Sequence, residues 1–487
     1  MPLRFTASII ILIAFLLPAI PGLSQDDLPK DYLTPAFHTG RRTALRQLMP
    51  DNSVMVVMAY PVRTFSNDVD YLYHPNPDMY YFSGYKEPHS LLLIFKEEQT
   101  DSAGNKYNEV LFVQKRDARQ EQWTGKRLGT EGARERSGIQ RVYNGEDFNN
   151  FPIDFSRFSK IIFSRLPEDI ANSNWEKADL YDLVQQFKQK AALPDGYASD
   201  SRFDNRTYFQ LTGALREIKT PEEMVLIRKA VEISCQGQNE VMKAVHPGMS
   251  ELEIQGLHEF VHKKYGAEGV GYGSIIGSGE NGCTLHYEEN TKTRIGTSMV
   301  LMDVGAEYHG YTADVTRTVP AQGKFSPEEK LIYQLVYDAQ EAAFEKLKDG
   351  AKWSDAGTAA REVIAEGLLK LGIIKNKSEV SKYYPHGLSH HIGLDVHDRG
   401  ASPTLKKDMV ITIEPGIYVP AGSNCDKKWW SIAVRIEDDA LITQNGYELL
   451  SHFAPRSVEE IEKMIARPSS LDDFKLPPLQ SAEKKGF

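Results

Sequence analysis

The chain has 487 residues, of which 41% are hydrophobic and 25% charged, a composition typical of a globular protein with a large core. Its length predicts two or more domains. The formal net charge of -10 argues against a nucleic-acid partner, and no basic stripe interleaved with aromatic residues is visible. The three scattered cysteines, Cys235, Cys283 and Cys425, do not make a disulfide scaffold; one pair could form, but we expect buried or half-buried thiols.

The N-terminus has the pattern of a secretory signal peptide. Arg4 precedes an apolar stretch over residues 9–17, and the small residues Gly22 and Ser24 stand where a signal peptidase requires them. We therefore predict a signal peptide over residues 1–24, cleaved between Ser24 and Gln25, and an exported protein that is periplasmic or secreted. A membrane anchor is the alternative, but the apolar stretch is shorter than the ~20 residues of a spanning helix. We expect no other membrane contact.

Residues 26–205 alternate short β-like runs with helical stretches. The apolar runs 54–58, 90–95, 109–113 and 160–163 predict buried strands, and residues 37–48 and 175–192 predict helices. This order is typical of an α/β domain. A turn-rich segment over residues 193–196 leads to the second domain, which we place at 206–465.

The second domain repeats one order of elements. Thr220-Pro221-Glu222-Glu223 predicts a capped helix start, and the helix ends near 246–248. A similar helix runs from Ser250 to about 266, a third from Ser326 to about 348, and a fourth from Ser354 to about 372. Each pair of helices precedes a β-rich segment, which indicates an internal duplication with a pseudo-twofold axis. Residues 466–487 are polar and rich in proline, and we expect a tail without chemistry.

Three apolar, strand-like runs in the last third of the chain each carry a carboxylate. They are residues 300–304 with Asp303, 410–414 with Glu414, and 432–437 with Glu437. A carboxylate on a buried strand is costly unless a cation meets it, and oxygen-rich sites suit hard metals. A hairpin through residues 307–310 would bring Asp314 near Asp303.

His390 lies between the first two runs and offers a nitrogen ligand. One imidazole and four carboxylates carry more negative charge than one divalent ion requires, but they suit two. Paired metals are a known hydrolytic arrangement, because they lower the pKa of a shared water and polarise the scissile carbonyl. The residues therefore predict a dinuclear metal enzyme.

Residues 270–440 resemble the pita-bread metallopeptidases, the family of aminopeptidase P, prolidase and methionine aminopeptidase, with aminopeptidase P the closest match. The strings that carry the resemblance are residues 277–287, the Asp303–Asp314 hairpin, 386–398, 414–418 and 435–438. Residues 77–85, 116–117 and 123–129 resemble the creatinase-type N-terminal domain of the same family. The resemblance implies an α/β N-terminal domain followed by an α+β pita-bread catalytic domain.

The resemblance also implies the metal ligands. Asp303 would bind one metal, His390 and Glu414 the other, and Asp314 and Glu437 would bridge both. The implied metal is Mn(II), with Zn(II) and Co(II) left open by the mixed donors.

Further side chains match positions of the family's substrate site. His286 and His397 would donate hydrogen bonds to the peptide carbonyl or its oxyanion, and His386 would move a proton or support the ligands. Glu414 would pass a proton to the leaving nitrogen, and Arg435 would balance the acidic cluster. Tyr418 would line the site near the metals. Ordinary packing or surface exposure is the alternative for each.

Asp68 and Trp123 match positions that reach the substrate pocket of a neighbouring subunit. The resemblance thus implies a homo-oligomer, a dimer or tetramer, although Trp123 could simply be a packing residue. The pair Trp429-Trp430 is less family-like, and we expect it to be exposed.

The function that the resemblance implies is Xaa-Pro aminopeptidase activity, the removal of one residue from peptides with proline second. A proline amide has no N–H and a fixed φ, so general aminopeptidases handle it poorly. Prolidase, which accepts only dipeptides, is the nearest alternative. Methionine aminopeptidase, a creatine-type hydrolase and a non-catalytic peptide-binding module are further alternatives; the retained ligand set disfavours the last two.

Overall fold

A computed structural model describes residues 31–173, 177–194, 200–471 and 476. The predicted signal peptide, its cleavage point, the first residues of the predicted helix 175–192 and most of the predicted tail lie outside these residues. Residues 33–487 form one compact unit, so the predicted boundary between residues 205 and 206 stays a prediction. Across the described part of the chain, every helix is too short or too polar to cross a bilayer.

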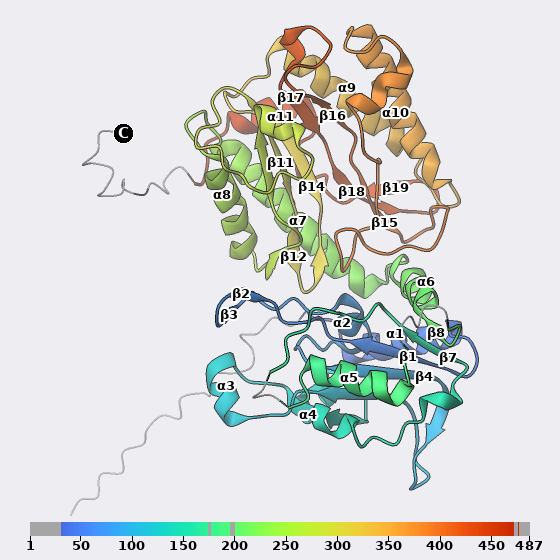
Figure 1. The fold of residues 1–487 in the computed structure, drawn as a ribbon. Helices are drawn as coiled ribbons and strands as arrows, with labels where there is room; N and C mark the ends of the chain where they lie inside the picture. The colour runs from blue at the N-terminus through green and yellow to red at the C-terminus, as the bar shows by residue number, and fades with distance from the viewer. Residues whose placement is uncertain (1–30, 174–176, 195–199, 472–475, 477–487) are drawn as a thin grey trace, which may run out of the picture. The chain divides into compact units, whose positions relative to one another are not determined.

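The N-terminal half is built on a six-stranded mixed sheet (Figure 1). Its strand order is β6-β5-β4-β1-β7-β8. The bounds are β1 Ser53–Met58, β4 Leu91–Thr100, β5 Lys106–Val113, β6 Val142–Asn144, β7 Lys160–Phe163 and β8 Phe203–Asp204. β1 pairs antiparallel with β4 and parallel with β7, which places β1 in the middle of the sheet.

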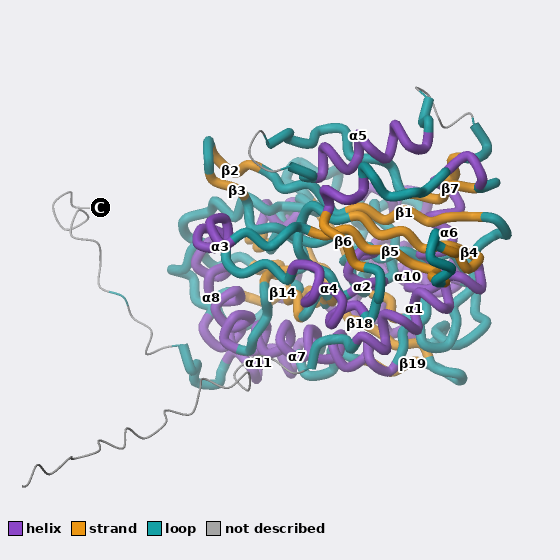
Figure 2. The backbone as a smooth tube through the Cα atoms, turned by 90° about the horizontal axis from the view of Figure 1, so that it is seen from below, coloured by secondary structure: helices purple, strands orange, loops and turns teal. Residues whose placement is uncertain are grey.

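Helices cover both faces of this sheet (Figure 2). Because successive side chains of a strand point to opposite faces, Val54 and Val56 join the core under α5 (Leu180–Ala191), whereas Met55 and Val57 join the core under α1 (Pro35–Leu48). A strand buried on both faces is apolar throughout, and this is why its run was recognisable in the sequence.

The four predicted strands of this half are confirmed, with β4 and β5 longer than their apolar runs. The predicted helix 175–192 begins later, at Leu180, because Asp179 accepts a hydrogen bond from the Asp182 amide and caps it. Several elements were not predicted: the hairpin β2 (Thr64–Ser66) and β3 (Val69–Asp70), and the helices α2 Pro77–Ser83, α3 Ala118–Thr124, α4 Gly129–Ser137 and α6 Asn205–Arg216.

The C-terminal half has the predicted order of two helices, strands, two helices, strands. The helices are α7 Pro221–Ala244, α8 Glu251–Lys264, α9 Pro327–Phe344 and α10 Trp353–Lys370. The first strands are β9 Gly269–Val270, β10 Ile275–Ser278, β11 Met299–Val304, β12 Ala306–Tyr308, β13 Tyr311–Thr312 and β14 Val315–Pro320. The second are β15 Val410–Ile413, β16 Gly416–Val419, β17 Ile432–Arg435, β18 Asp438–Ile442 and β19 Tyr447–Leu449.

The helix starts agree with their capping signals. Thr220 and Glu223 form a reciprocal capping box at the start of α7, and Ser250 and Ser326 begin similar boxes at α8 and α9. Helix α10 begins at Trp353 instead of after Ser354, and α9 ends at Phe344, before the predicted 348. A further helix, α11 (Val458–Ile465), precedes the predicted tail.

The strands place the predicted carboxylates with one correction. Asp303 lies within β11, opposite Thr316 of β14, and a turn at His309 and Gly310 with positive φ closes the expected hairpin. Glu414 and Glu437, however, follow the ends of β15 and β17 instead of lying inside them. A strand end leaves each carboxylate free to turn toward a cavity.

The pair Trp429-Trp430 is not exposed as expected. Trp429 is buried against the core of the C-terminal half, and the Trp430 indole N–H donates to the Ser423 carbonyl at 3.0 Å. The cysteines agree with expectation, since all three are free thiols, Cys235 buried and the others half-buried.

Candidate functional site

A cavity of about 430 Å³ opens between the two β-rich segments of the C-terminal half. Most of the residues that line it have polar or charged side chains. The lining residues include Tyr272, Leu285, His286, Asp303, Asp314, His386, His390, His397, Glu414, Arg435 and Glu437. All five predicted metal ligands and every predicted histidine therefore face one space.

Four of the five predicted ligands converge on one another. The Nε2 atom of His390 lies 3.5 Å from Asp314 Oδ2, 3.5 Å from Glu414 Oε1 and 3.9 Å from Glu437 Oε1. Ligand atoms of Asp314, His390 and Glu437 all lie within 4.8 Å of one another, a spacing that could hold a metal ion. His390 Nδ1 donates to the His391 carbonyl at 3.0 Å, which turns Nε2 into the cavity.

Asp303, the fifth ligand, is held by two neighbours. Arg435 donates to Asp303 Oδ2 at 2.5 Å. The Tyr272 hydroxyl lies 2.5 Å from Asp303 Oδ1 and 2.5 Å from Asp314 Oδ1 and so connects the two aspartates. Burial raises the pKa of Asp303, but the Arg435 charge and the hydrogen bonds from Tyr272 and Arg435 together outweigh burial and leave the pKa below its ordinary value.

The other three carboxyl groups repel one another. Burial, followed by the charges of neighbouring carboxylates, raises the pKa of Asp314 and of Glu414 well above their ordinary values. The same causes raise the pKa of Glu437 to about 8. Carboxylates so crowded in a low-dielectric site are favourable when cations lie among them. The oxygen-rich donor set with one imidazole thus fits two divalent ions.

The histidines line the same cavity in different settings. His386 Nε2 lies 2.9 Å from the Tyr418 hydroxyl, and its Nδ1 lies 3.6 Å from Glu414. Burial lowers the pKa of His386 and of His390 to about 4, so both rings are neutral at pH 7, the state in which an imidazole can ligate a metal. His397 is exposed to the cavity and packs edge-on against the His390 ring, with centroids 4.4 Å apart. His286 is also exposed.

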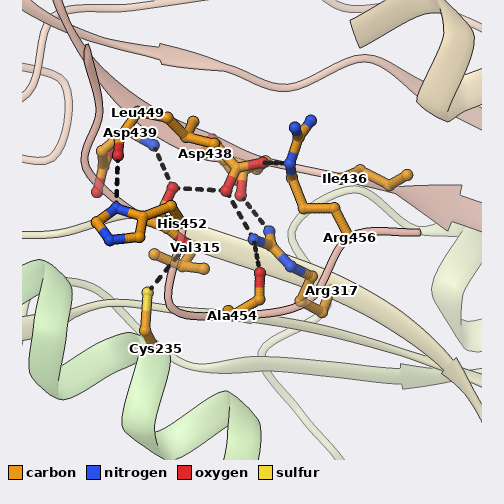
Figure 3. A network of polar contacts seen from close by, with 12 residues as sticks. Cys235, Val315, Arg317, Ile436, Asp438, Asp439, Leu449, His452, Ala454 and Arg456 are labelled. Atoms are coloured by element: carbon orange, nitrogen blue, oxygen red, sulfur yellow. Dashed lines mark hydrogen bonds and ion pairs between the residues drawn. The ribbon is translucent and has the colours of Figure 1, made fainter. Parts of the chain in front are cut away.

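A buried ion-pair network outside the cavity supports the predicted ligands (Figure 3). Arg317 donates to Asp438 at 2.6 Å and to the carbonyls of Glu437 and Ala454, at 2.7 and 3.0 Å. The Thr316 hydroxyl donates to Glu437 Oε2 at 2.6 Å, and the Asp314 amide donates to Asp439 Oδ2 at 3.1 Å. These contacts hold the two expected bridging carboxylates in place.

Three predicted site residues are not among those that line the cavity. Tyr418 is buried and contacts the lining residues His386 and Arg435 instead. Asp68 lies between β2 and β3 and is exposed, and Trp123 lies on α3 with 83% of its surface exposed. Neither lines the cavity of its own chain.

Some residues of the site had no recognised signal in the sequence. Tyr272 joins Asp303 and Asp314, and nothing in the residues next to it marks it as part of the site. Arg317 and Asp438 resemble any charged residues of a strand, and only the pairing of distant strands reveals that they meet.

Comparisons with known proteins agree with this geometry. Residues 225–444 match the profile of metallopeptidase family M24, and residues 38–159 match the aminopeptidase P N-terminal domain. The Xaa-Pro aminopeptidase of Escherichia coli (strain K12) is 33% identical over 440 residues, covering 87% of this chain and 96% of that protein. Human Xaa-Pro aminopeptidase 3 is 30% identical, covering 92% and 87%. Among solved structures, E. coli aminopeptidase P with the inhibitor Pro-Leu superimposes with a TM-score of 0.78 at 31% identity, covering 89% of this chain and 98% of that one.

Proposed function

This chain belongs to metallopeptidase family M24 and is a metallo-aminopeptidase that hydrolyses the N-terminal Xaa-Pro bond of peptides, and we propose that it does so with two Mn(II) ions held by five of its own side chains. The observation that carries the proposal is the convergence of His390 with Asp314, Glu414 and Glu437 at 3.5–3.9 Å, beside Asp303. Mixed oxygen and nitrogen donors suit Mn(II), and Zn(II) or Co(II) are the competing ions.

The ligands divide between the two ions. Asp303 would hold one ion, His390 and Glu414 would hold the other, and Asp314 and Glu437 would be shared by both. When bound, such ions supply a nucleophilic water at neutral pH and polarise the scissile carbonyl. The carboxylate-rich wall also attracts the ammonium group at the peptide's N-terminus.

The neighbouring side chains act on the substrate and its protons. His286 and His397 donate hydrogen bonds to the carbonyl oxygen of the first residue and stabilise the charge that develops there. Glu414 accepts a proton and delivers it to the proline nitrogen as the bond breaks. His386, 3.6 Å from Glu414 and hydrogen-bonded to Tyr418, exchanges that proton with solvent.

Arg435 keeps one ligand charged. Its guanidinium is buried, binds Asp303 at 2.5 Å and donates a hydrogen bond to the Tyr418 hydroxyl at 2.9 Å. A carboxylate held as an anion binds a divalent ion without first losing a proton. Tyr418 thereby connects Arg435 to His386.

Assembly into a homo-oligomer, a dimer or tetramer, is part of the proposal. Asp68 and Trp123 are exposed, and Phe65 and Leu72, close to Asp68 in the sequence, expose 62% and 92% of their surfaces. Exposed apolar side chains so close together mark interaction surfaces. Asp68 and Trp123 of one subunit would border the cavity of another, and light scattering of the purified protein measures the assembly.

Export is likewise proposed, on the pattern of residues 1–24. Cleavage between Ser24 and Gln25 would release a periplasmic or secreted enzyme, which N-terminal sequencing of the mature protein tests.

The testing experiment compares an Xaa-Pro-Pro tripeptide with an Xaa-Pro dipeptide, using Mn(II)-loaded mature protein and an Asp303→Ala control. Cleavage of the tripeptide at its first bond, lost in the control, is the expected result. Cleavage of the dipeptide alone would identify a prolidase instead. Metal-loaded protein that cleaves neither peptide would favour a binding module.

A further inference from the structure

Arg216, the last residue of α6, lies at the centre of a buried charge cluster outside the catalytic cavity. Its guanidinium binds three carboxylates: Asp78 at 2.8 Å, Asp395 at 2.7 Å and Asp398 at 2.5 Å. Only 1% of the Arg216 side chain is exposed. Two of these carboxylates flank His397 in the sequence. We propose that Arg216 is a positioning residue that holds the His397 loop in its catalytic geometry, an inference that rests on the proposed function.

The loop is anchored on both sides of His397. Asp398 binds Arg216 and, at 3.3 Å, Lys219, while its amide donates to the His391 carbonyl at 2.9 Å. On the other side, Asp395 binds Arg216, and its carbonyl accepts from the Gly393 amide at 3.1 Å. A single guanidinium therefore ties together the residues two before and one after the histidine. The planar fork of arginine suits such multiple binding, whereas a lysine ammonium does not.

The third carboxylate connects this loop to the N-terminal half. Asp78 belongs to α2 and accepts hydrogen bonds from the Tyr208 hydroxyl at 2.8 Å and from Arg399 at 2.6 Å. The cluster is balanced, because the carboxylates of Asp78, Asp395 and Asp398 meet the cations Arg216, Lys219 and Arg399. Asp78, which lies within the residues matched by the N-terminal domain profile, is thus linked through Arg216 to the His397 loop of the catalytic half.

The position of the His397 ring depends on this backbone. The ring is exposed to the cavity and leans against His390. A shift of the loop by a fraction of an ångström would misdirect the hydrogen bond that His397 donates to the substrate carbonyl, and misplacement of that size reduces catalysis strongly. Arg216 does not line the cavity, so its effect on turnover must pass through the loop.

The test is a double-mutant cycle of Arg216→Lys with His397→Ala, on Mn(II)-loaded full-length enzyme and an Xaa-Pro-Pro tripeptide. We expect Arg216→Lys to lower kcat at least tenfold with KM changed less than threefold and with two metal ions still bound. In the His397→Ala background the same substitution should change kcat less than threefold, because the group it positions is gone. Where steady-state turnover is too slow, single-turnover cleavage of the tripeptide with enzyme in excess gives the same comparison.

Two further variants keep the inference falsifiable. Asp395→Asn removes one of the charges that bind Arg216, at a side chain that is 37% exposed. If Arg216→Lys does not fold, this variant replaces it, and its loss of kcat should likewise depend on the presence of His397. Arg228→Lys, at the exposed pair with Glu448, is the matched control and should leave kcat unchanged. An equal loss in both His397 backgrounds, or no loss in either, would overturn the inference while the wild type stays active. An inactive wild type would overturn the proposed function and this inference together.

Discussion

At the scale of single residues, the site works by opposing pKa shifts of neighbouring groups. The Arg435 charge keeps the pKa of Asp303 below its ordinary value, whereas burial and crowding raise the pKa of Asp314, Glu414 and Glu437. The anionic form of one predicted ligand is therefore favoured before any cation binds, whereas the anionic forms of the other three are disfavoured until cations lie among them. This division follows from which carboxylate has a cationic neighbour.

Metal loading should release protons. Because its raised pKa of about 8 keeps Glu437 mostly protonated at pH 7 without a cation, and the pKa values of Asp314 and Glu414 are raised as well, Mn(II) binding must displace protons. We expect metal affinity to rise with pH up to about 8, and titration calorimetry in buffers of different ionisation enthalpy to count the released protons. Equal heats in all buffers would contradict this.

We expect Tyr418 to contribute to catalysis through its hydroxyl group alone. The hydroxyl lies 2.9 Å from His386 Nε2 and accepts a hydrogen bond from the Arg435 guanidinium at 2.9 Å. Removing a hydrogen bond to a charged group costs about 1.5–3 kcal/mol, so Tyr418→Phe should lower kcat about tenfold or more with metal content unchanged. Tyr447→Phe, on a surface strand, is the control. Unchanged steady-state kcat would show that the proton route does not use this hydroxyl.

At the scale of elements, the turn before His397 depends on close approach of chain segments. A Cβ on Gly393 would lie 2.1 Å from Asp398 Oδ2 and 3.1 Å from Lys219 Nζ. Only glycine leaves room for the buried ion pair at this point, because any side chain would push the carboxylate away from its cation.

Gly393→Ala should therefore destabilise the protein. Overpacking of this kind costs about 1–3 kcal/mol, so we expect a lower urea-unfolding midpoint. Gly256→Ala, in the exposed middle of α8 where a Cβ meets nothing within 4 Å, should instead stabilise by about 1 kcal/mol. Equal midpoints for the two variants would refute this account.

At the scale of the whole molecule, burial of neutral histidines links stability to pH. His258 and His262 are packed side by side on α8 against Gly237, and His38 is buried under α2. Burial lowers the pKa of His38 and of His262 to about 4 and that of His258 well below its ordinary value. In the unfolded chain each of these imidazoles takes up a proton as the pH falls through about 6.5, the ordinary histidine pKa. In the folded chain the same imidazoles stay neutral at that pH.

Stability should therefore fall as the pH drops from 7 toward 4. For His262 alone, the difference between an unfolded pKa of about 6.5 and a folded one of about 4 corresponds to about 2 kcal/mol lost between pH 8 and pH 5. His262→Gln should show a shallower loss in urea unfolding across this range, and His246→Gln, at an exposed histidine, should not. Parallel curves for all three proteins would exclude the linkage.

The sequence by itself determined the features that repeat a local pattern. Apolar runs marked the central strands, capping boxes marked the helices α7, α8 and α9, and ordered motifs marked Asp303, Asp314, His390, Glu414 and Glu437. The tertiary structure alone decided which side chains from distant segments meet. Tyr272 between the aspartates, Arg317 behind Glu437 and Arg216 among three carboxylates carry no local signal, because a buried charge is stabilised by partners far away in the chain. Local periodicity depends on residues that are neighbours in the sequence, whereas ion pairs between distant segments form only once the strands and helices have packed.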